Sequence, residues 1–240
     1  MGPMAGHDTS LRVPASCRPG EHHKTRREVT EIVEEYVEGI FRLREALGKV
    51  TTGDLAEYMC VSAGSASAML RRLKDLRLVK HEPYRSIELT EEGERLAKQL
   101  TRTHRILKRF LVDVVGLPWN DVHEIACKLE HHVSGDVVDQ IFDRLGRPAT
   151  CPHGNPIDPD TEDGSIPLYR AAEGQVWVVQ KVTNEGYDFL RFLEEAGLVP
   201  GRKVEVEGRT EFDDLVHLRA GDRKLTVGRD VSRHVWVRRA

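Results

Sequence analysis

The sequence predicts a multi-domain, mainly α-helical protein: a winged helix-turn-helix, then an all-α unit, then a small C-terminal β-barrel. Three observations predict this class. Apolar residues recur at helical spacing between residues 29 and 145. Two short helices within that span are joined by a tight turn and followed by a β-ribbon. After residue 168 the hydrophobic period changes to two, in short strands at regular spacing.

The first amphipathic helix is predicted to begin at Val29 and to end before Gly48, because apolar residues keep the i, i+3, i+4, i+7 spacing throughout. A short second helix and a tight turn lead to Ser62, a good N-cap for the third helix. Two short strands around a turn at 82–85 complete the pattern. Together these elements predict a winged helix-turn-helix.

Thr90 caps the next predicted helix, and Ser134 caps the last helix of the second unit, which ends at Gly146. The stretch that follows is rich in Pro, Gly and Asp, so we expect it to bury little and to serve as a linker. The predicted organisation is a flexible N-terminal arm (1–27), a winged helix-turn-helix DNA-binding domain (28–95), a second helical domain (96–147), a linker (148–167) and a barrel (168–240).

Composition excludes several classes of protein. No apolar run approaches the ~20 residues that cross a bilayer, and the N-terminus has no apolar signal segment. The net charge of −3 disfavours a non-specific nucleic-acid binder, although it allows a local basic patch. The 4 cysteines include no C-x-x-C pair, so a disulfide framework or zinc ribbon is not expected. We therefore expect a cytoplasmic protein without a membrane partner.

The sequence His123-x-x-x-Cys127-x-x-Glu130-His131 carries the strongest chemical signal. Residues at i, i+4, i+7 and i+8 of a helix fall on one stripe. Imidazole, thiolate and carboxylate are ligands of divalent transition metals, and burying them without partners would cost several kcal/mol. The pattern favours a metal site, and the alternative is the polar surface of a charged helix.

Two other predicted helices offer matching groups. His104 stands between apolar positions on the long helix after the wing. Glu35 and Glu38 are three residues apart on the first helix. A solvated acidic face is the alternative for these two glutamates, because other glutamates lie on the same helix.

The start of the third helix predicts a DNA-reading surface. Small side chains let a helix N-terminus approach the major groove closely, serine hydroxyls can bond bases or phosphates, and arginines neutralise phosphates. A helical protein-interaction module is the alternative. The candidate DNA-binding residues are Ser62, Ser65, Ser67, Ala68, Arg71, Arg72 and Arg85.

These motifs resemble the metal-dependent repressors of the diphtheria toxin repressor family, which includes iron- and manganese-dependent regulators. The resemblance runs almost without gaps from residue 28 to residue 146, and the barrel is more loosely similar to the SH3-like (FeoA-type) third domain of the family. The segments that carry the resemblance are Glu35–Leu43, Ser62–Leu78, Leu89–Gly93, Thr103–Arg105, Val122–Cys127, Leu129–Ser134 and His153–Ile157.

The resemblance implies a metal-activated homodimer that binds double-stranded operator DNA, with residues 96–147 as a metal-binding and dimerisation domain. It implies a primary metal site containing Cys127, Glu130 and His131. Glu35 stands where iron-type members have methionine and manganese-type members have aspartate, and Glu38 matches a manganese-type ligand.

The resemblance also implies a second metal site containing His104 and His123. There the chain departs from the family pattern, because Lys108 occupies the place of a glutamate ligand. A charged ammonium only donates hydrogen bonds and cannot ligate metal. In the barrel, Glu185 and Asp188 are only weak candidate ligands.

The ligand set favours Mn²⁺ over Fe²⁺, because carboxylates suit hard ions, although the Cys127 thiolate suits softer ones. We therefore expect a metal-activated transcriptional repressor that binds a palindromic operator and controls metal-homeostasis genes, and we do not expect an enzyme. The alternatives are a winged-helix regulator that senses an organic ligand and, less favoured, a metalloenzyme.

Overall fold

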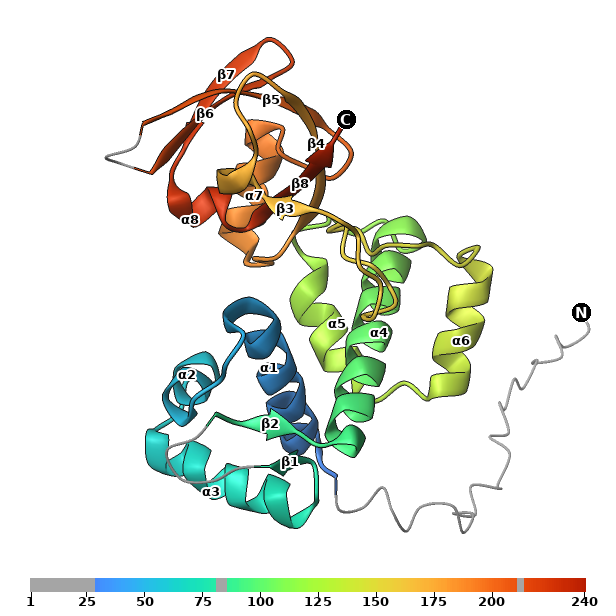
Figure 1. Cartoon of the computed structure of the whole chain (residues 1–240). Coiled ribbons are helices and arrows are strands. Elements are labelled where there is room, and N and C mark those ends of the chain that lie inside the picture. Colours follow the sequence, from blue (N-terminus) through green and yellow to red (C-terminus); the bar gives the residue numbers. More distant parts are fainter. Residues whose placement is uncertain (1–28, 81–85, 211–213) are drawn as a thin grey trace, which may run out of the picture. The chain divides into compact units, whose positions relative to one another are not determined.

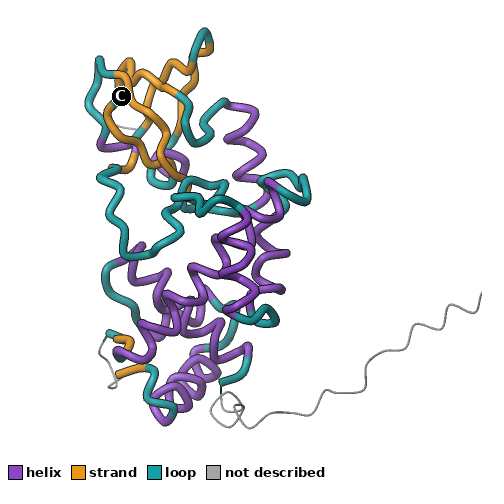
Figure 2. The backbone as a smooth tube through the Cα atoms, turned by 90° about the vertical axis from the view of Figure 1, so that its right-hand side faces the viewer, coloured by secondary structure: helices purple, strands orange, loops and turns teal. Residues whose placement is uncertain are grey.

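The computed structural model describes residues 29–80, 86–210 and 214–240, and residues 31–240 form one compact unit (Figures 1 and 2). The predicted N-terminal arm, the turn of the hairpin and Arg85 lie outside the described residues. None of the helices described there is long and apolar enough to cross a membrane.

The winged helix-turn-helix forms as predicted, and its second and third helices begin at residues whose side chains cap them. Thr51 and Asp54 make a capping box at the start of the second helix, and the Ser62 side chain accepts a hydrogen bond from the Ser65 backbone N–H. The first strand pairs antiparallel with the second. The elements are α1 (Glu31–Leu47), α2 (Thr52–Tyr58), α3 (Ala63–Asp75), β1 (Val79–Lys80) and β2 (Glu88–Leu89).

Helix α4 (Glu91–Asp113) starts against the wing with almost no space between the two backbones. A Cβ atom on Gly93 would lie 2.1 Å from the carbonyl oxygen of Leu78. Gly93→Ala is therefore expected to destabilise the fold by roughly 1–3 kcal/mol, because the methyl group forces α4 away from β1. Thermal denaturation followed by circular dichroism measures this. Gly135→Ala is the control, since a Cβ there meets open space, and equal losses in the two variants would contradict the argument.

Helices α4, α5 (Val122–Glu130) and α6 (Gly135–Arg144) form the second unit, with α4 in contact with both of the others and with α1 (Figure 1). The sequence predicts a helix over residues 121–133, and α5 ends three residues earlier, at Glu130. His131 is its C-cap and keeps a right-handed helical backbone, so it stays on the stripe that begins at His123. The predicted metal-ligating stripe therefore survives the shorter helix.

The segment after α6 is not the loosely packed linker that the sequence predicts. Cys151 and Ile157 are buried in an apolar cluster with Ile106 and Val138. The expectation that residues 148–167 bury little is wrong for this part. Composition alone does not predict this burial, because a few apolar side chains between the glycines and prolines are enough to anchor the segment.

Gly154 shows how closely this segment approaches the C-terminal sheet. Its φ is +83°, and a Cβ there would lie 2.0 Å from the Gln180 carbonyl oxygen. The Val182 backbone N–H donates to the His153 carbonyl oxygen at 2.9 Å. The absence of a side chain at Gly154 is what allows this contact.

The C-terminal domain is a six-stranded antiparallel sheet, of order β3-β8-β4-β5-β6-β7, around one apolar core. The sequence predicts a helix at about 187–196 and strands at 175–182, 203–206, 216–219, 224–227 and 234–237, and all of them are present. The short β3 and α8 are not predicted, because two to four residues carry too little pattern. The predicted fold class is thus confirmed. The elements are β3 (Ile166–Pro167), a 3₁₀ turn (Leu168–Arg170), β4 (Val176–Val182), α7 (Tyr187–Ala196), β5 (Lys203–Thr210), β6 (Leu215–Ala220), β7 (Arg223–Val227), α8 (Arg229–Ser232) and β8 (Val235–Arg239).

Candidate metal centre

The packing of α4 on α5 gathers three potential metal ligands. One ligand atom from each of His104, His123 and Cys127 lies within 4.8 Å of the others. The Cys127 Sγ is 3.9 Å from His104 Nδ1 and 3.8 Å from His123 Nε2. Burial lowers the pKa of His104 well below its usual value, with the charge of Lys108 acting in the same direction. His104 is therefore a neutral imidazole, the form that ligates metal.

Glu130 brings a buried carboxyl group to the same cluster, with its Oε2 2.7 Å from His104 Nδ1. Burial and then the nearby charge of Glu38 raise the pKa of Glu130 to about 9. Burial and then Glu130 raise the pKa of the Cys127 thiol to about 12. These acidic groups lack enough positive charge around them to ionise together. The donor set therefore fits a divalent cation, which would supply that charge.

Helix α1 contributes the other side of the centre, through Glu34 and Glu38. The Oε2 of Glu34 is 2.7 Å from Nδ1 of His131, whose Nε2 is 3.6 Å from Glu130 Oε1. Glu38 is buried and accepts a hydrogen bond from Arg42 at 2.7 Å. Carboxylates of α1 thus lie next to the ligating face of α5.

Glu35 is the member of the predicted set that the structure does not bring to this cluster. Its side chain is exposed, while the neighbouring Glu34 makes the contact with His131. Successive residues of a helix point about 100° apart, so Glu34 and Glu35 cannot both face α5. A ligand role for Glu35 stays a prediction.

A second cluster of ionisable groups lies between α4 and the C-terminal sheet, around Glu185. The Lys108 Nζ donates to Glu185 Oε1 at 2.6 Å, and His123 Nδ1 is 2.8 Å from Oε2. Cys151, His153 and Glu185 also each offer a ligand atom within 4.8 Å of the others. The sequence marks Glu185 only as a weak candidate ligand. It does not connect Glu185 to Cys151 and His153, because their packing depends on the buried segment after α6.

The charge of Lys108 dominates the electrostatics of this second cluster. Burial alone would raise the pKa of Glu185, but Lys108 and hydrogen bonds from the surrounding histidines hold it well below its usual value. Burial also opposes ionisation of Cys151, yet Lys108 and His153 lower the pKa of that thiol to about 7. Asp188, the other barrel candidate, is exposed and lies 3.6 Å from Arg191.

The candidate DNA-reading residues of α3 lie on its solvent side. Ala66, Leu70 and Leu73 are buried and fix the opposite face against the domain core. The hydroxyl groups of Ser62 and Ser65 are 2.9 Å apart and cap the helix. Among the candidates, Ser67 is half-buried, and the exposed ones are Ser62, Ser65, Ala68, Arg71 and Arg72.

Comparisons with known proteins match this architecture along nearly the whole described chain. Residues 28–87 match the model of the iron dependent repressor N-terminal DNA binding domain. Residues 90–159 match the iron dependent repressor metal binding and dimerisation domain, and residues 166–239 match the FeoA domain. The fold and the cluster define a metal-regulated DNA-binding protein.

Among its relatives, the iron-dependent repressor IdeR of Mycobacterium tuberculosis is 33% identical over 196 residues, covering 75% of this chain and 85% of that protein. The diphtheria toxin repressor of Corynebacterium diphtheriae is 28% identical over 205 residues, or 80% and 91% of the two chains. The chain belongs to this family of metal-dependent transcriptional repressors, and the resemblance seen in the sequence is confirmed.

Solved structures agree with this assignment. A manganese-dependent transcriptional repressor in complex with manganese has a TM-score of 0.79 and 30% identity, covering 86% of this chain and 99% of that one. ScaR with bound Zn²⁺ has a TM-score of 0.77 and 27% identity over the same shares of the two chains. Since the relatives and structural neighbours are repressors, the metalloenzyme alternative is set aside.

Proposed function

We propose that this protein is a cytoplasmic, metal-activated repressor that binds a palindromic operator as a homodimer and controls metal-homeostasis genes, with Mn²⁺ favoured over Fe²⁺. One observation carries the proposal: carboxylates of α1, in the DNA-binding domain, contact the histidine and carboxyl ligands of α5. The proposed metal ligands are Glu34, Glu38, His104, Cys127, Glu130 and His131. His123 is left out of this set because its Nδ1 lies 2.8 Å from Glu185 Oε2.

A divalent cation at this cluster would couple metal binding to DNA binding. Without it, burial and the charge of Glu38 keep Glu130 protonated at the contact between α1 and α5. With it, Glu130 can ionise and the cation ties α1 to α5, which fixes the spacing of the two α3 helices in a dimer. A palindromic operator requires that spacing to be about one helical turn (~34 Å) or a multiple of it. A coupling of about 1–3 kcal/mol between metal and DNA is typical of such switches.

The preference for manganese rests on the carboxylate count. Glu34, Glu38 and Glu130 offer hard oxygen ligands, and Cys127 offers a softer sulfur ligand. Affinity in vitro is expected to follow the Irving–Williams order, with Zn²⁺ and Co²⁺ binding more tightly than Mn²⁺. Selectivity must therefore be read from activation of DNA binding.

Exposed apolar side chains support the dimer. Ile125 and Leu129 are 37% exposed and stand one turn apart on α5, and Val137 on α6 is 46% exposed. All three lie in the region that matches the metal binding and dimerisation domain. A twofold interface would cover such a surface with its own copy.

The decisive experiment measures operator binding by fluorescence anisotropy under anaerobic conditions, with Mn²⁺, Fe²⁺, Co²⁺ or Zn²⁺ and after EDTA treatment. We expect EDTA to release the DNA and added Mn²⁺ to restore DNA binding. The wild-type protein should need a lower free Mn²⁺ concentration for this than variants with a substituted ligand. DNA binding that EDTA leaves unchanged would favour the alternative, a regulator that senses an organic ligand.

The arginines of α3 give a separate prediction. Arg71→Ala or Arg72→Ala should weaken binding to specific and non-specific DNA alike, and should reduce the slope of log affinity against log salt by about 1, because each removes one phosphate contact. Arg191→Ala, at an exposed arginine of α7, is the control and should leave the slope unchanged. A salt slope that stays the same in all three variants would remove α3 from the DNA interface.

A further inference from the structure

The carboxylate of Glu185 connects the C-terminal sheet to three parts of the metal-binding region. Glu185 lies in the loop between β4 and α7. Its Oε1 accepts from Lys108 of α4 at 2.6 Å and lies 3.4 Å from the Nδ1 of buried His153. Its Oε2 lies 2.8 Å from Nδ1 of His123 on α5. A single side chain therefore touches α4, α5 and the segment after α6.

Lys108 supplies the positive charge at this junction. Its side chain is 1% exposed, and Glu185 is the carboxylate that pairs with it. A buried ammonium is strongly unfavourable unless it is paired and hydrogen-bonded. Separating the sheet from α4 would leave that charge without its partner, so the ion pair holds the two together.

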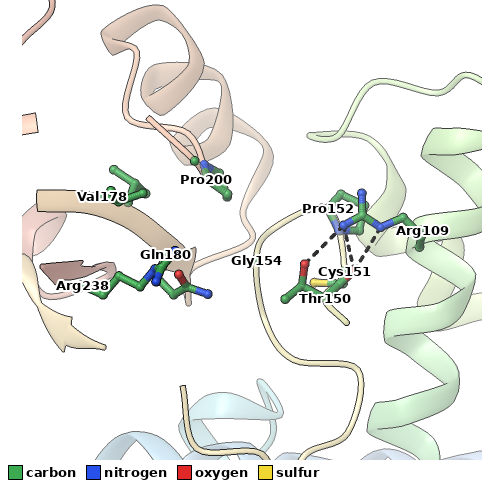
Figure 3. Close-up of a pocket in the computed structure, with 11 residues that line it drawn as sticks. Arg109, Thr150, Cys151, Pro152, Gly154, Val178, Gln180, Pro200 and Arg238 are labelled. Atoms are coloured by element: carbon green, nitrogen blue, oxygen red, sulfur yellow. Dashed lines mark hydrogen bonds between the residues drawn. The ribbon is translucent and has the colours of Figure 1, made fainter. Parts of the chain in front are cut away.

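Other contacts also lie at this junction, including the hydrogen bond from the Val182 backbone N–H to the His153 carbonyl oxygen at 2.9 Å. Arg109 donates to the Thr150 carbonyl oxygen at 2.7 Å. Residues 150–154, β4 and Arg238 line a cavity of about 310 Å³ beside this contact (Figure 3). Trp119 packs against the apolar core of the sheet. Between α4 and the loop after β4, the Lys108–Glu185 contact at 2.6 Å is shorter than the approach of His104 Nε2 to Glu185 Oε2 at 3.7 Å.

The same residues argue against a metal ion here. His104 and His123 face Glu185, with His104 Nε2 3.7 Å from Oε2, and this set alone resembles a metal site. However, the Lys108 ammonium already bonds the carboxylate, is a donor only, and places a positive charge beside any incoming cation. The group of Cys151, His153 and Glu185 meets the same obstacle, because it shares the same carboxylate.

We propose that the ammonium of Lys108 takes the place of a second metal ion, so that a built-in cation holds the C-terminal domain to α4 and α5 whether or not metal is present. In this protein the barrel is then a fixed part of the dimerisation unit, and metal acts only at the contact between α1 and α5. The statement about where metal acts rests on the proposed function, whereas the role of the Lys108–Glu185 ion pair does not.

The test combines metal counting with hydrogen exchange on the full-length protein. Native mass spectrometry counts Mn²⁺ per chain, and exchange is followed in peptides covering residues 150–157 and 183–187. Wild type should bind no more than one Mn²⁺, and its exchange in these peptides should be equal in EDTA and in Mn²⁺. Lys108→Glu places a second carboxylate beside Glu185. The Lys108→Glu variant should bind one more Mn²⁺ than wild type. Its exchange rate in these peptides should rise roughly 10-fold in EDTA and return to the wild-type rate in Mn²⁺.

Lys108→Met removes the charge without adding a ligand, so exchange should be faster both in EDTA and in Mn²⁺. Lys98→Met is the matched control: it lies on the same helix and pairs with Asp160 at an exposed site, and should change nothing in these peptides. More than one Mn²⁺ per wild-type chain, chelator-induced loss of protection in wild type, or unchanged exchange in Lys108→Met overturns the proposal. If Lys108→Glu fails to fold, the wild-type and Lys108→Met measurements still decide. Failure of the proposed function has a different signature, namely operator binding that does not respond to Mn²⁺.

Discussion

Glu130→Gln should remove the stimulation of operator binding by Mn²⁺ almost completely. The substitution keeps the shape of the side chain and removes the carboxylate that lies between His104 and His131. A neutral amide is a weak ligand, and it cannot ionise to give the carboxylate that binds the cation. If the metal–DNA coupling is about 1–3 kcal/mol, a stimulation of roughly 5- to 150-fold should fall to near one-fold. Anisotropy titrations of operator DNA with and without Mn²⁺ measure the ratio directly.

Glu124→Gln is the matched control for this prediction. It makes the same chemical change on the same helix, but at an exposed position outside the cluster. Both variants should remain dimeric in analytical ultracentrifugation, because Ile125 and Leu129 are untouched. His131→Ala should reproduce the loss seen in Glu130→Gln. Full Mn²⁺ stimulation in either variant of the centre would contradict the coupling of α1 to α5.

The parts of this protein that the sequence predicts well are those fixed by local rules. Ser62 and Thr90 cap helices where the sequence places those caps. The stripe of His123, Cys127 and Glu130 follows from helical spacing alone, and the structure brings these residues together with His104. Spacing within one helix determines such features, whatever the tertiary packing.

The features that were missed depend on how separate elements dock. The burial of Cys151 and His153 arises from the approach of their segment to β4, which Gly154 permits. Lys108 stood out in the sequence as an unsuitable ligand, but its pairing with Glu185 could not be predicted, since 77 residues separate the two. No local pattern specifies contacts of that range.

The rotation of α1 about its axis is the clearest feature that the sequence does not predict. It determines which of two adjacent glutamates faces α5. The helical pattern places Glu34 and Glu35 on the edge of the apolar stripe, and a change of about 100° exchanges their roles. The resemblance favours Glu35, whereas the structure shows Glu34 bonded to His131 and Glu35 exposed. The stability of the observed rotation comes from the apolar face of α1, where Val33, Val37 and Ile40 are buried.

Glu34→Gln is therefore expected to raise the Mn²⁺ concentration needed for operator binding by about 10- to 100-fold. This is the effect of losing a metal ligand or a residue that directly supports one. Glu35→Gln should have little effect, because the exposed carboxylate has no contact with the cluster. The two variants carry the same change at neighbouring positions, so the comparison is internally controlled, and isothermal titration with Mn²⁺ measures it without DNA. A larger effect of Glu35→Gln than of Glu34→Gln would mean that α1 rotates by about one residue when metal binds. Rotation of the DNA-binding domain, and not charge neutralisation at a preformed contact, would then be the step that activates the repressor.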